Sequence, residues 1–458
     1  MATASIQTVP AQVPIRWNTL GILKTSRAVI LALDLLLLIA IAVGASVHRG
    51  AMQTIGKDAA PSIIAAQHIK SSMADMDANA ANELLGSAGT MTQAVDAYEQ
   101  RRVEASKALI AAAENITYGE SERNPILSLQ IGLGTYERLI QKARDRHDTS
   151  SGGVADTYRQ AAQVMDGTLL PAADALDRAN NQVLEHTFQS QSTRSLGART
   201  FVLLAGAIAA IAIAVVQMFL SGRMRRTFNP ALLCATLLTI ALTVYAWLAM
   251  ESERYQLKVA KEDAFTSMRA LWRARAIAYE ANGDESRYLL DPGHAQQHEA
   301  AFSDRSASLA TLPADHSRDQ IMASLRHGTR VNGFTGYLAD ELNNITFRGE
   351  RDSAIESLAA WETYQDVDAR IRQLQRQGQT RQAIDLCLGN AQGQSNWAFD
   401  QFDHALLATL QINQKAFDTA VDQGMSALSA LEIKALAVAA LIAALAFLGL
   451  APRIREYQ

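Results

Sequence analysis

Hydrophobic positions gather in four uninterrupted runs, and the chain between them alternates apolar with polar positions. Of the 458 residues, 49% are hydrophobic and 19% are charged. A hydrocarbon core of about 30 Å needs roughly 20 apolar residues in a helix. Four runs meet this requirement, and each predicts a transmembrane helix: residues 28–47, 199–220, 230–250 and 433–451. The first run also resembles a secretory signal peptide, but its length exceeds the usual core of ~7 to 15 apolar residues, which favours a retained anchor.

The polar segments 48–198 and 251–432 have the periodicity of helices. Apolar residues recur at steps of three and four, as from Ile69 to Leu84 and from Phe399 to Phe417, and such stripes pack into bundle cores. Turn-forming residues divide each segment into about four helices, near Gly86, Asn115, Ser150, Pro292, Asn344 and Gly378. We therefore expect an all-α integral membrane protein with four transmembrane helices and two four-helix bundles outside the cytoplasm. Gly167 and Pro171 predict a bend in the fourth helix of the first bundle.

The two polar segments resemble each other in sequence. Aligning Asp58 with Asp263 also aligns Ser62 with Ser267 and places residues 77–83 on 282–288. Further along, the motif at 115–120 recurs at 344–350 with one inserted residue, the pair Thr135 and Tyr136 recurs as Thr363 and Tyr364, and Asp174 and Asp177 recur as Asp400 and Asp403. The pattern indicates a two-pass unit that was duplicated and fused.

Basic residues near the ends of the apolar runs predict the orientation, because they resist translocation. They occur in three short segments: 1–27 with Arg16, Lys24 and Arg27, 221–229 with Arg223, Arg225 and Arg226, and 452–458 with Arg453 and Arg455. All three segments fall on one side of the membrane. We expect 1–27, the loop 221–229 and the tail 452–458 to be cytoplasmic, so that both termini lie inside the cell.

The overall charge and the rarer residues exclude several functions. A net charge of −4 without a basic stripe argues against a nucleic-acid partner. Cys234 lies in an apolar run and Cys387 is alone in its segment, so no disulfide is expected within either outer domain. His294 and His298 have a spacing that can bind a metal ion, but no cysteine or known motif supports such a site. We expect no metal, no cofactor, no catalytic residue and no enzymatic activity.

Two sets of residues are candidates for binding a ligand or a partner. The segment 282–288 contains an arginine beside acidic, amide and phenolic groups that together could hold a small zwitterion: Asn282, Asp284, Glu285, Arg287 and Tyr288. The competing interpretation is a solvated helix face with an ordinary pair between Asp284 and Arg287. Asn115 and Asn344 begin the repeated turn motif, where they either stabilise the turn and the next helix or contact a partner.

Charged groups in and beside the membrane form the remaining candidates. Asp34 lies inside the first apolar run, where a carboxylate is costly enough to suggest a function, although pairing with Arg27 or helix packing explains it equally. Arg223, Arg225 and Arg226 form the basic loop that we expect to contact a cytoplasmic protein.

The arrangement of two outer helical segments on four membrane helices, together with segments 282–290 and 344–350, resembles the actinobacterial GlnX group of membrane proteins. The resemblance implies a location in the bacterial plasma membrane. It also implies that the chain relays the state of an extracytoplasmic amino-acid-binding protein to a cytoplasmic serine/threonine kinase. The outer segments are similar to chemoreceptor-type four-helix-bundle sensor domains as well, but no kinase, HAMP or methyl-accepting segment follows any membrane helix.

Three classes of function remain open. A non-catalytic signalling adaptor fits best, a scaffold or assembly factor for a cell-envelope complex comes second, and a transporter comes third because the apolar runs contain few polar groups. Apart from the lipid bilayer, the expected partners are a solute-binding protein outside and a kinase inside. The sequence is also compatible with an oligomer.

Overall fold

The computed structural model describes residues 19–87, 91–149, 152–224 and 229–456. These residues are overwhelmingly helical, and their only β-type pairing is an isolated antiparallel bridge between Thr311 and Thr335. The expectation of an all-α protein is therefore confirmed. The helices follow one another in this order: α1 (Thr19–Gln53), η1 (Thr54–Ala59), α2 (Ala60–Leu85), α3 (Thr92–Glu114), α4 (Glu120–Asp148), α5 (Val154–Val164), η2 (Met165–Leu169), α6 (Leu170–Met224), α7 (Pro230–Lys258), η3 (Val259–Phe265), α8 (Thr266–Leu290), η4 (Pro292–His294), α9 (Ala295–Leu309), α10 (Arg318–Arg326), α11 (Tyr337–Asn343), α12 (Glu350–Arg376), α13 (Thr380–Leu388) and α14 (Ser395–Arg455).

The chain divides into two compact units. The membrane unit consists of Met1–Arg49, Ser192–Glu253 and Ser426–Gln458. The polar unit consists of Gly50–Gln191, here called the first half, and Arg254–Met425, the second half. The segments that we expected to form separate domains thus belong to one compact unit.

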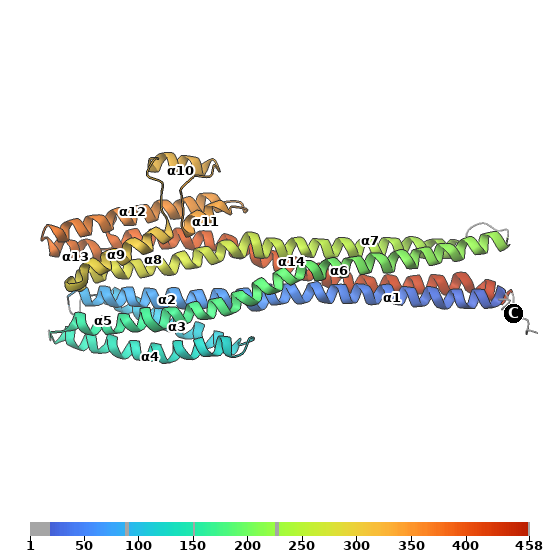
Figure 1. Cartoon of the computed structure of the whole chain (residues 1–458), viewed down its shortest axis with the longest axis horizontal. Helices are drawn as coiled ribbons and strands as arrows, with labels where there is room; N and C mark the ends of the chain where they lie inside the picture. Colours follow the sequence, from blue (N-terminus) through green and yellow to red (C-terminus); the bar gives the residue numbers. More distant parts are fainter. Residues whose placement is uncertain (1–18, 88–90, 150–151, 225–228, 457–458) are drawn as a thin grey trace, which may run out of the picture. The chain divides into compact units, whose positions relative to one another are not determined.

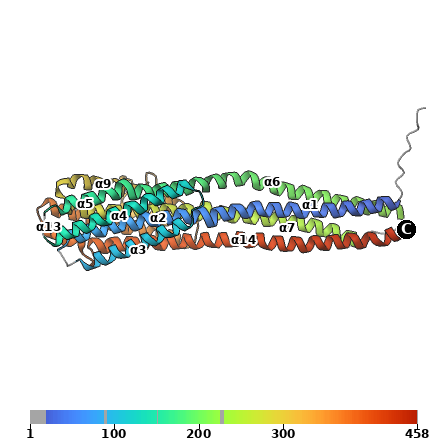
Figure 2. The ribbon, with the colours of Figure 1, turned by 90° about the horizontal axis from the view of Figure 1, so that it is seen from below.

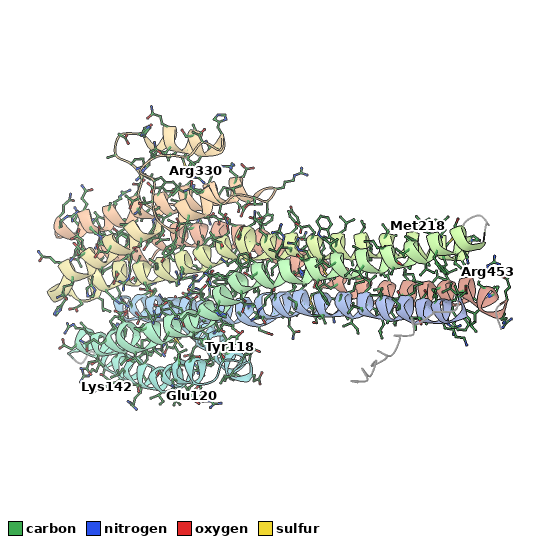
Figure 3. The ribbon with its side chains drawn as sticks, turned by 45° about the vertical axis from the view of Figure 1, so that its right-hand side comes forward. Tyr118, Glu120, Lys142, Met218, Arg330 and Arg453 are labelled. Atoms are coloured by element: carbon green, nitrogen blue, oxygen red, sulfur yellow. The ribbon has the colours of Figure 1, made fainter. Side chains whose placement is uncertain are left out.

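In the part of the chain that the structure describes, four helices are long and apolar enough to cross a bilayer, as the sequence predicted, and their apolar stretches lie in the membrane unit. Its parts of α1, α6, α7 and α14 run side by side (Figures 1 and 2). Residues such as Leu37 and Ile213 are buried between them, whereas Leu204 is exposed. Met218 likewise points outward (Figure 3). An apolar outer surface is the property that contact with lipid requires. Gly206 allows α6 and α7 to approach closely, because a Cβ atom there would overlap the side chain of Thr243.

The first half of the polar unit has the helices that the sequence predicted. Within it α2 packs against α3, and α4 packs against α5. The helices end where turn residues were expected: α2 at Gly86, α3 at Asn115, and α5 begins after Gly153 with its positive φ of 85°. That each polar segment forms a four-helix bundle remains a prediction.

The second half is more divided than the sequence suggested. Between α9 and α11 the chain leaves the other helices, forms α10 and returns through the bridge from Thr311 to Thr335 (Figure 1). Ser317 and Gln320 form a capping box at the start of α10, and Arg318 on α10 forms ion pairs with Glu362 and Asp366 of α12. A short additional helix, α13, precedes α14.

The two halves share one hydrophobic core. A single cluster of buried residues joins Ile69 and Met73 of α2 with Leu271 of α8, Trp361 of α12 and Phe402 of α14. Helices α2 and α8 lie along each other and form the main contact between the halves. This shared core explains why the halves form one unit rather than two.

Three π-helical turns interrupt the helices at Thr54–Ala59, Met165–Leu169 and Val259–Phe265. The first and third occupy equivalent positions when Asp58 is aligned with Asp263. Pro61 and Pro171 each follow a π turn closely, and a proline lacks the N–H that would complete the α-helical ladder. The bend expected at Gly167 and Pro171 thus coincides with a π-helical turn.

Candidate functional site

The contact between α2 and α8 is unusually polar for a protein interior. Buried polar or charged residues on α2 and α8 are Gln67, Ser71, Ser72, Asp75, Asp77, Asn82, Ser267, Arg275, Asn282, Asp284, Glu285, Ser286 and Arg287. Burying a charge is costly unless it is paired and hydrogen-bonded. The partners of these groups therefore show what the contact can do.

Arg287 is the centre of one buried charge cluster. Its guanidinium donates to the Tyr158 hydroxyl at 3.1 Å, to Asp284 at 2.9 Å, and to Asp77 of the first half. The Tyr136 hydroxyl also donates to Asp77, at 2.8 Å. A second arginine, Arg305 of α9, binds Asp284. Asp77 and Asp284 thus meet two guanidinium groups, and Arg305 binds Glu280 as well, at 3.1 Å.

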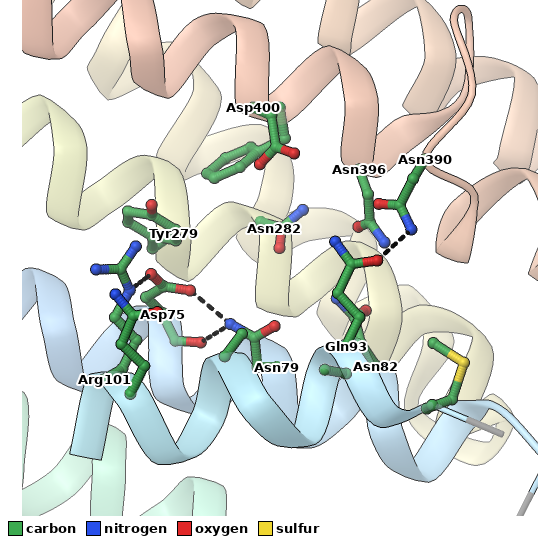
Figure 4. A pocket seen from close by; sticks show the side chains of 15 residues that line it. Asp75, Asn79, Asn82, Gln93, Arg101, Tyr279, Asn282, Asn390, Asn396 and Asp400 are labelled. Atoms are coloured by element: carbon green, nitrogen blue, oxygen red, sulfur yellow. Dashed lines mark hydrogen bonds and ion pairs between the residues drawn. The ribbon is translucent and has the colours of Figure 1, made fainter. Parts of the chain in front are cut away.

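Arg275 forms a second cluster on the same helix. Its guanidinium binds both oxygens of Asp403, at 2.6 and 2.9 Å, which is the bidentate geometry of a strong pair. Nearby, Asp75 of α2 pairs with Arg101 of α3 and accepts a hydrogen bond from Asn79 at 2.6 Å (Figure 4). Burial raises the pKa of Asp75 to about 6, although the charge of Arg101 opposes that rise.

Glu285 lies in a third environment, away from any arginine at hydrogen-bond distance. Its Oε1 accepts from the Ser395 hydroxyl at 2.5 Å and from the Cys387 thiol at 3.5 Å, while its Oε2 has no partner among the described residues. Burial, and secondarily the negative charge of Asp368, raise the pKa of Glu285 to about 8. A neutral carboxyl group at neutral pH follows from this environment.

The structure shows where the candidate binding residues of segment 282–288 lie. All are buried, so the segment is not a solvated helix face, even though the expected pair of Asp284 with Arg287 is present. They point in different directions. Asn282 donates to the Tyr364 hydroxyl at 3.3 Å. The guanidinium carbon of Arg372 lies 4.6 Å from the centre of the Tyr288 ring. Their role as one binding site stays a prediction.

Asn115 and Asn344 make equivalent contacts in their turns. Each side-chain amide donates to a serine hydroxyl at 3.0 Å, Ser62 in the first half and Ser267 in the second. Each motif also has a threonine hydroxyl that donates to the carbonyl of its own asparagine. These bonds support the turn-stabilising interpretation, and contact with a partner stays a prediction.

The glutamate that accepts hydrogen bonds from the turn amides stands at a different position in each half. Glu350 accepts hydrogen bonds from the amides of Thr346 and Phe347, at 2.7 and 2.8 Å. In the first half the same role belongs to Glu122, which accepts from Thr117 and Tyr118, whereas Glu120 is exposed and pairs with Arg123 (Figure 3). Both helices begin at the aligned glutamate, α4 at Glu120 and α12 at Glu350, so the helix start is the same, but in the first half the carboxylate that accepts from the turn lies two residues further on.

Of the charged groups in and beside the membrane, Asp34 is buried in the membrane unit, and its Oδ1 has no hydrogen-bond partner among the described residues. Arg27 does not pair with it but lies over the ring of Phe447, 4.8 Å from its centre. Arg223 lies in the last turn of α6, while Arg225 and Arg226 lie outside the described residues. Their proposed contact with a cytoplasmic partner is untested.

The sequence analysis did not predict the charged pairs that lie at one end of the apolar helices. His48 of α1 and Glu253 of α7 form a fully buried pair, and Arg49 pairs with Glu432 of α14 at 2.7 Å. Arg199 of α6 pairs with Glu251 of α7. The signal was a charged residue at one end of each apolar run, but sequence spacing does not show which charges meet.

The histidines with metal-like spacing face a carboxylate instead of each other. Nδ1 of His294 and Nε2 of His298 lie 3.2 and 3.7 Å from Asp291. Among the described residues, no group of three or more histidine, cysteine or acidic side chains is placed to hold a metal ion.

Comparison with known proteins gives one match. Residues 51–189 match the family model of an actinobacterial sensor domain. This range covers nearly all of the first half of the polar unit. No curated protein and no solved structure matches the chain. The match and the four apolar helices together indicate a membrane sensor.

Proposed function

We propose that this chain is a non-catalytic membrane sensor that passes a binding event outside the cell to a separate cytoplasmic protein. The observation that carries the proposal is the sensor-domain match over residues 51–189, the segment between the first two apolar helices. In this proposal the polar unit faces outward, and both termini and the loop at 221–229 face the cytoplasm.

Continuous helices supply the means of transmission. Helical hydrogen bonding continues from α1 through η1 into α2, and from α7 through η3 into α8. Packed helices shift as units by about 1 to 2 Å between discrete arrangements. A ligand biases such a shift only by its different affinity for the two arrangements. The polar contact between α2 and α8 is suited to this task because charge pairs there fix the relative position of two of these helices.

The partners follow from the resemblance to the GlnX group. We propose a solute-binding protein outside the membrane and a serine/threonine kinase inside it. Arg223 in the last turn of α6, together with Arg225 and Arg226 after it, gives the loop a positive charge that suits an acidic patch on the kinase.

We also infer that the two halves descend from one duplicated unit. Supporting this inference, Tyr136 bonds to Asp77 while Tyr364 bonds to Asn282, and these pairs occupy aligned positions. The bonds of Asn115 to Ser62 and of Asn344 to Ser267 are likewise equivalent. The two π turns at Thr54–Ala59 and Val259–Phe265 are aligned in the same way.

The test changes the charge of the basic loop. Arg223, Arg225 and Arg226 are replaced together by glutamate, and in a control variant by lysine, which keeps the charge that sets orientation. Threonine phosphorylation that depends on the kinase is measured in cells after addition of amino acids. We expect the lysine variant to respond and the glutamate variant to lose the response.

Orientation must be measured in the same variants. With Cys234 and Cys387 replaced by serine, a cysteine at Gly293 should react with a membrane-impermeant reagent in intact cells. A glutamate variant that is correctly oriented and still responds contradicts the adaptor proposal, and the scaffold function then becomes the better explanation.

A further inference from the structure

A small polar cavity lies where the two halves meet. Its volume is about 150 Å³, and it opens between α2 and α3 of the first half and α8 and α14 of the second (Figure 4). Most of its polar lining consists of carboxamide side chains: Asn79, Asn82, Gln93, Gln100, Asn282, Asn390 and Asn396. One water needs roughly 10–15 Å³ of such a cavity, so the cavity has room for about ten non-hydrogen atoms.

The repeat relates this cavity to the Arg287 cluster. Asn82 and Arg287 are aligned, as are Asp77 and Asn282. The contact of Arg287 with Asp77 therefore has an equivalent on the opposite side of the interface, where Asn82 and Asn282 both line the cavity. One side of the interface is filled by a charge pair, and the other holds a cavity between two neutral amides.

The surroundings of the two positions are also equivalent. Arg305 binds Glu280 at 3.1 Å and Asp284 on the filled side. On the cavity side Arg101 binds Asp75, which is aligned with Glu280, and also Glu104 of α3 at 2.6 Å. Asn79 stands where the alignment has Asp284. At the aligned positions of α2 and α8, the cavity side thus lacks one guanidinium and two carboxylates that the filled side contains. A ligand bearing both a cationic and an anionic group would supply both kinds of missing charge.

The lining retains polar groups that are free to meet such a ligand. Asp400 lines the cavity and makes no hydrogen bond or ion pair with the described residues, whereas its aligned counterpart Asp174 pairs with Lys70 at 3.0 Å. Several carboxamides are used only in part. Asn82 accepts from Ser286, and Asn396 donates to the Leu388 carbonyl at 3.0 Å, which leaves the other end of each amide without a partner among the described residues.

We propose that this cavity binds one small zwitterion the size of an amino acid, with its carboxylate toward Arg101 and its ammonium group toward Asp400. The carboxamides between these ends both donate and accept, and they favour a ligand with a polar side chain. The ligand touches α2 and α3 on one side and α8 and α14 on the other, so its binding changes the free energy of their relative arrangement. This inference rests on the proposed sensor function and names the class of its ligand.

The experiment titrates the full chain in lipid nanodiscs with L-serine, L-threonine, L-asparagine and L-glutamine, using isothermal titration calorimetry. We expect saturable binding of at least one of them. Analogues of that amino acid without the α-ammonium or without the α-carboxylate should bind at least about tenfold more weakly, because the first leaves Asp400 without a cation and the second loses the charge-assisted contact with Arg101.

Two variants test the position of the site. Asp400→Asn removes the free carboxylate without breaking a bond in the protein, and Ala97→Phe fills the cavity with an apolar ring. Both should weaken binding at least about tenfold, while the exposed Asp422→Asn on the same helix should leave it unchanged. Absence of binding by all four amino acids, or unchanged affinity in both cavity variants, overturns the proposal.

Failure here is distinguishable from failure of the sensor function. If the basic-loop variants abolish the cellular response but no amino acid binds the purified chain, the sensor function stands and the ligand site is refuted. If amino acids bind at the cavity but the loop variants still respond, the site stands and the adaptor function is refuted.

Discussion

At the scale of single residues, the interface is controlled by buried charges whose partners come from the other half. Arg287 is 4% exposed and Asp77 is 1% exposed, so water screens neither group. Such a pair contributes little to stability relative to apolar side chains, but removing one member leaves an uncompensated buried charge. Arg287 and Asp77 therefore determine how α8 of the second half packs against α2 of the first half.

Replacing Arg287 by methionine should lower the unfolding free energy by about 3–5 kcal/mol, because Asp77 loses its cation inside the protein. The double variant with Asp77→Asn should be less destabilised than the sum of the single variants. Thermal unfolding of the purified chain measures both effects. The exposed Arg381→Met is the control, and additive single effects would show that the pair is not coupled.

A second prediction concerns Glu285 and pH. Its pKa is about 8 in the folded protein, against an ordinary value of 4.5. The folded state then holds a proton that the unfolded state releases, so stability from this group falls as pH rises from about 5 to 8. Glu285→Gln stays neutral throughout, and its melting temperature relative to the natural chain should rise across this range. The exposed Glu356→Gln should show no such trend. The prediction would be contradicted if the melting temperature of Glu285→Gln differed from that of the natural chain by the same amount at every pH.

Sequence reasoning identified the polar segment at 282–288 but not its geometry. The mixture of residue types is visible in the sequence, whereas the direction of each side chain depends on which helix packs against α8. Asp77 was visible only as the counterpart of Asn282, and nothing local indicates that it faces Arg287. The cavity was not foreseen at all, because its lining comes from helices far apart in the chain.

At the scale of helices, the π turns are the most distinctive feature. They are rare and often lie at functional positions. η1 and η3 occupy aligned places, each about one helical turn beyond a boundary of the membrane unit, at Arg49 and at Glu253. A π turn holds one extra residue within a helical turn, so it changes the rotational register of the residues that follow it.

Deleting the exposed Lys57 should convert η1 into regular α-helix, because the π turn holds one residue more than an α-helical turn over the same rotation. Core residues such as Met52 and Ile63 should therefore keep facing the same interior. We expect a melting temperature close to that of the natural chain and similar to that of the control, deletion of Gly152 in the turn before α5. A large fall in melting temperature for the Lys57 deletion alone would contradict this prediction.

The helices that the sequence predicted best are those with long apolar stripes. The series from Ile69 to Leu84 lies in α2, and the series from Phe399 to Phe417 lies in α14. The excursion through α10 was missed, although Gly328, Gly333 and Gly336 all adopt positive φ and were visible as turn residues. A short amphipathic helix held by surface ion pairs leaves too weak a periodic signal to be recognised beforehand.

At the scale of the whole molecule, the four membrane helices were predictable because bilayer thickness fixes their length and composition. The packing of the two polar segments into one compact unit was not predictable in this way. Hydrophobic periodicity shows that a helix has a buried face, but not whether that face meets its own segment or the other one. Charge complementarity between Asp77 and Arg287 makes each half a partner for the other.

Expressing residues 1–228 and 229–458 as separate chains should give a 1:1 complex. Two copies of the first half would place Asp77 opposite Asn82, and two copies of the second would place Arg287 opposite Asn282, so each like pair lacks a balancing charge. Differently tagged halves and light scattering after size exclusion measure this. Like pairs as stable as the mixed complex would contradict it, and Arg287→Met should weaken the mixed complex.

The duplication that we infer gives the unequal distribution of charge between the two halves a consequence for their history. A gene rearrangement that replaced one half by a copy of the other would bury a carboxylate or a guanidinium without its partner. We therefore expect selection against gene conversion between the two halves, so that both halves of a chain are inherited together. Genealogies drawn separately from first halves and from second halves should branch in the same order, with substitutions at Asp77 accompanied by substitutions at Arg287.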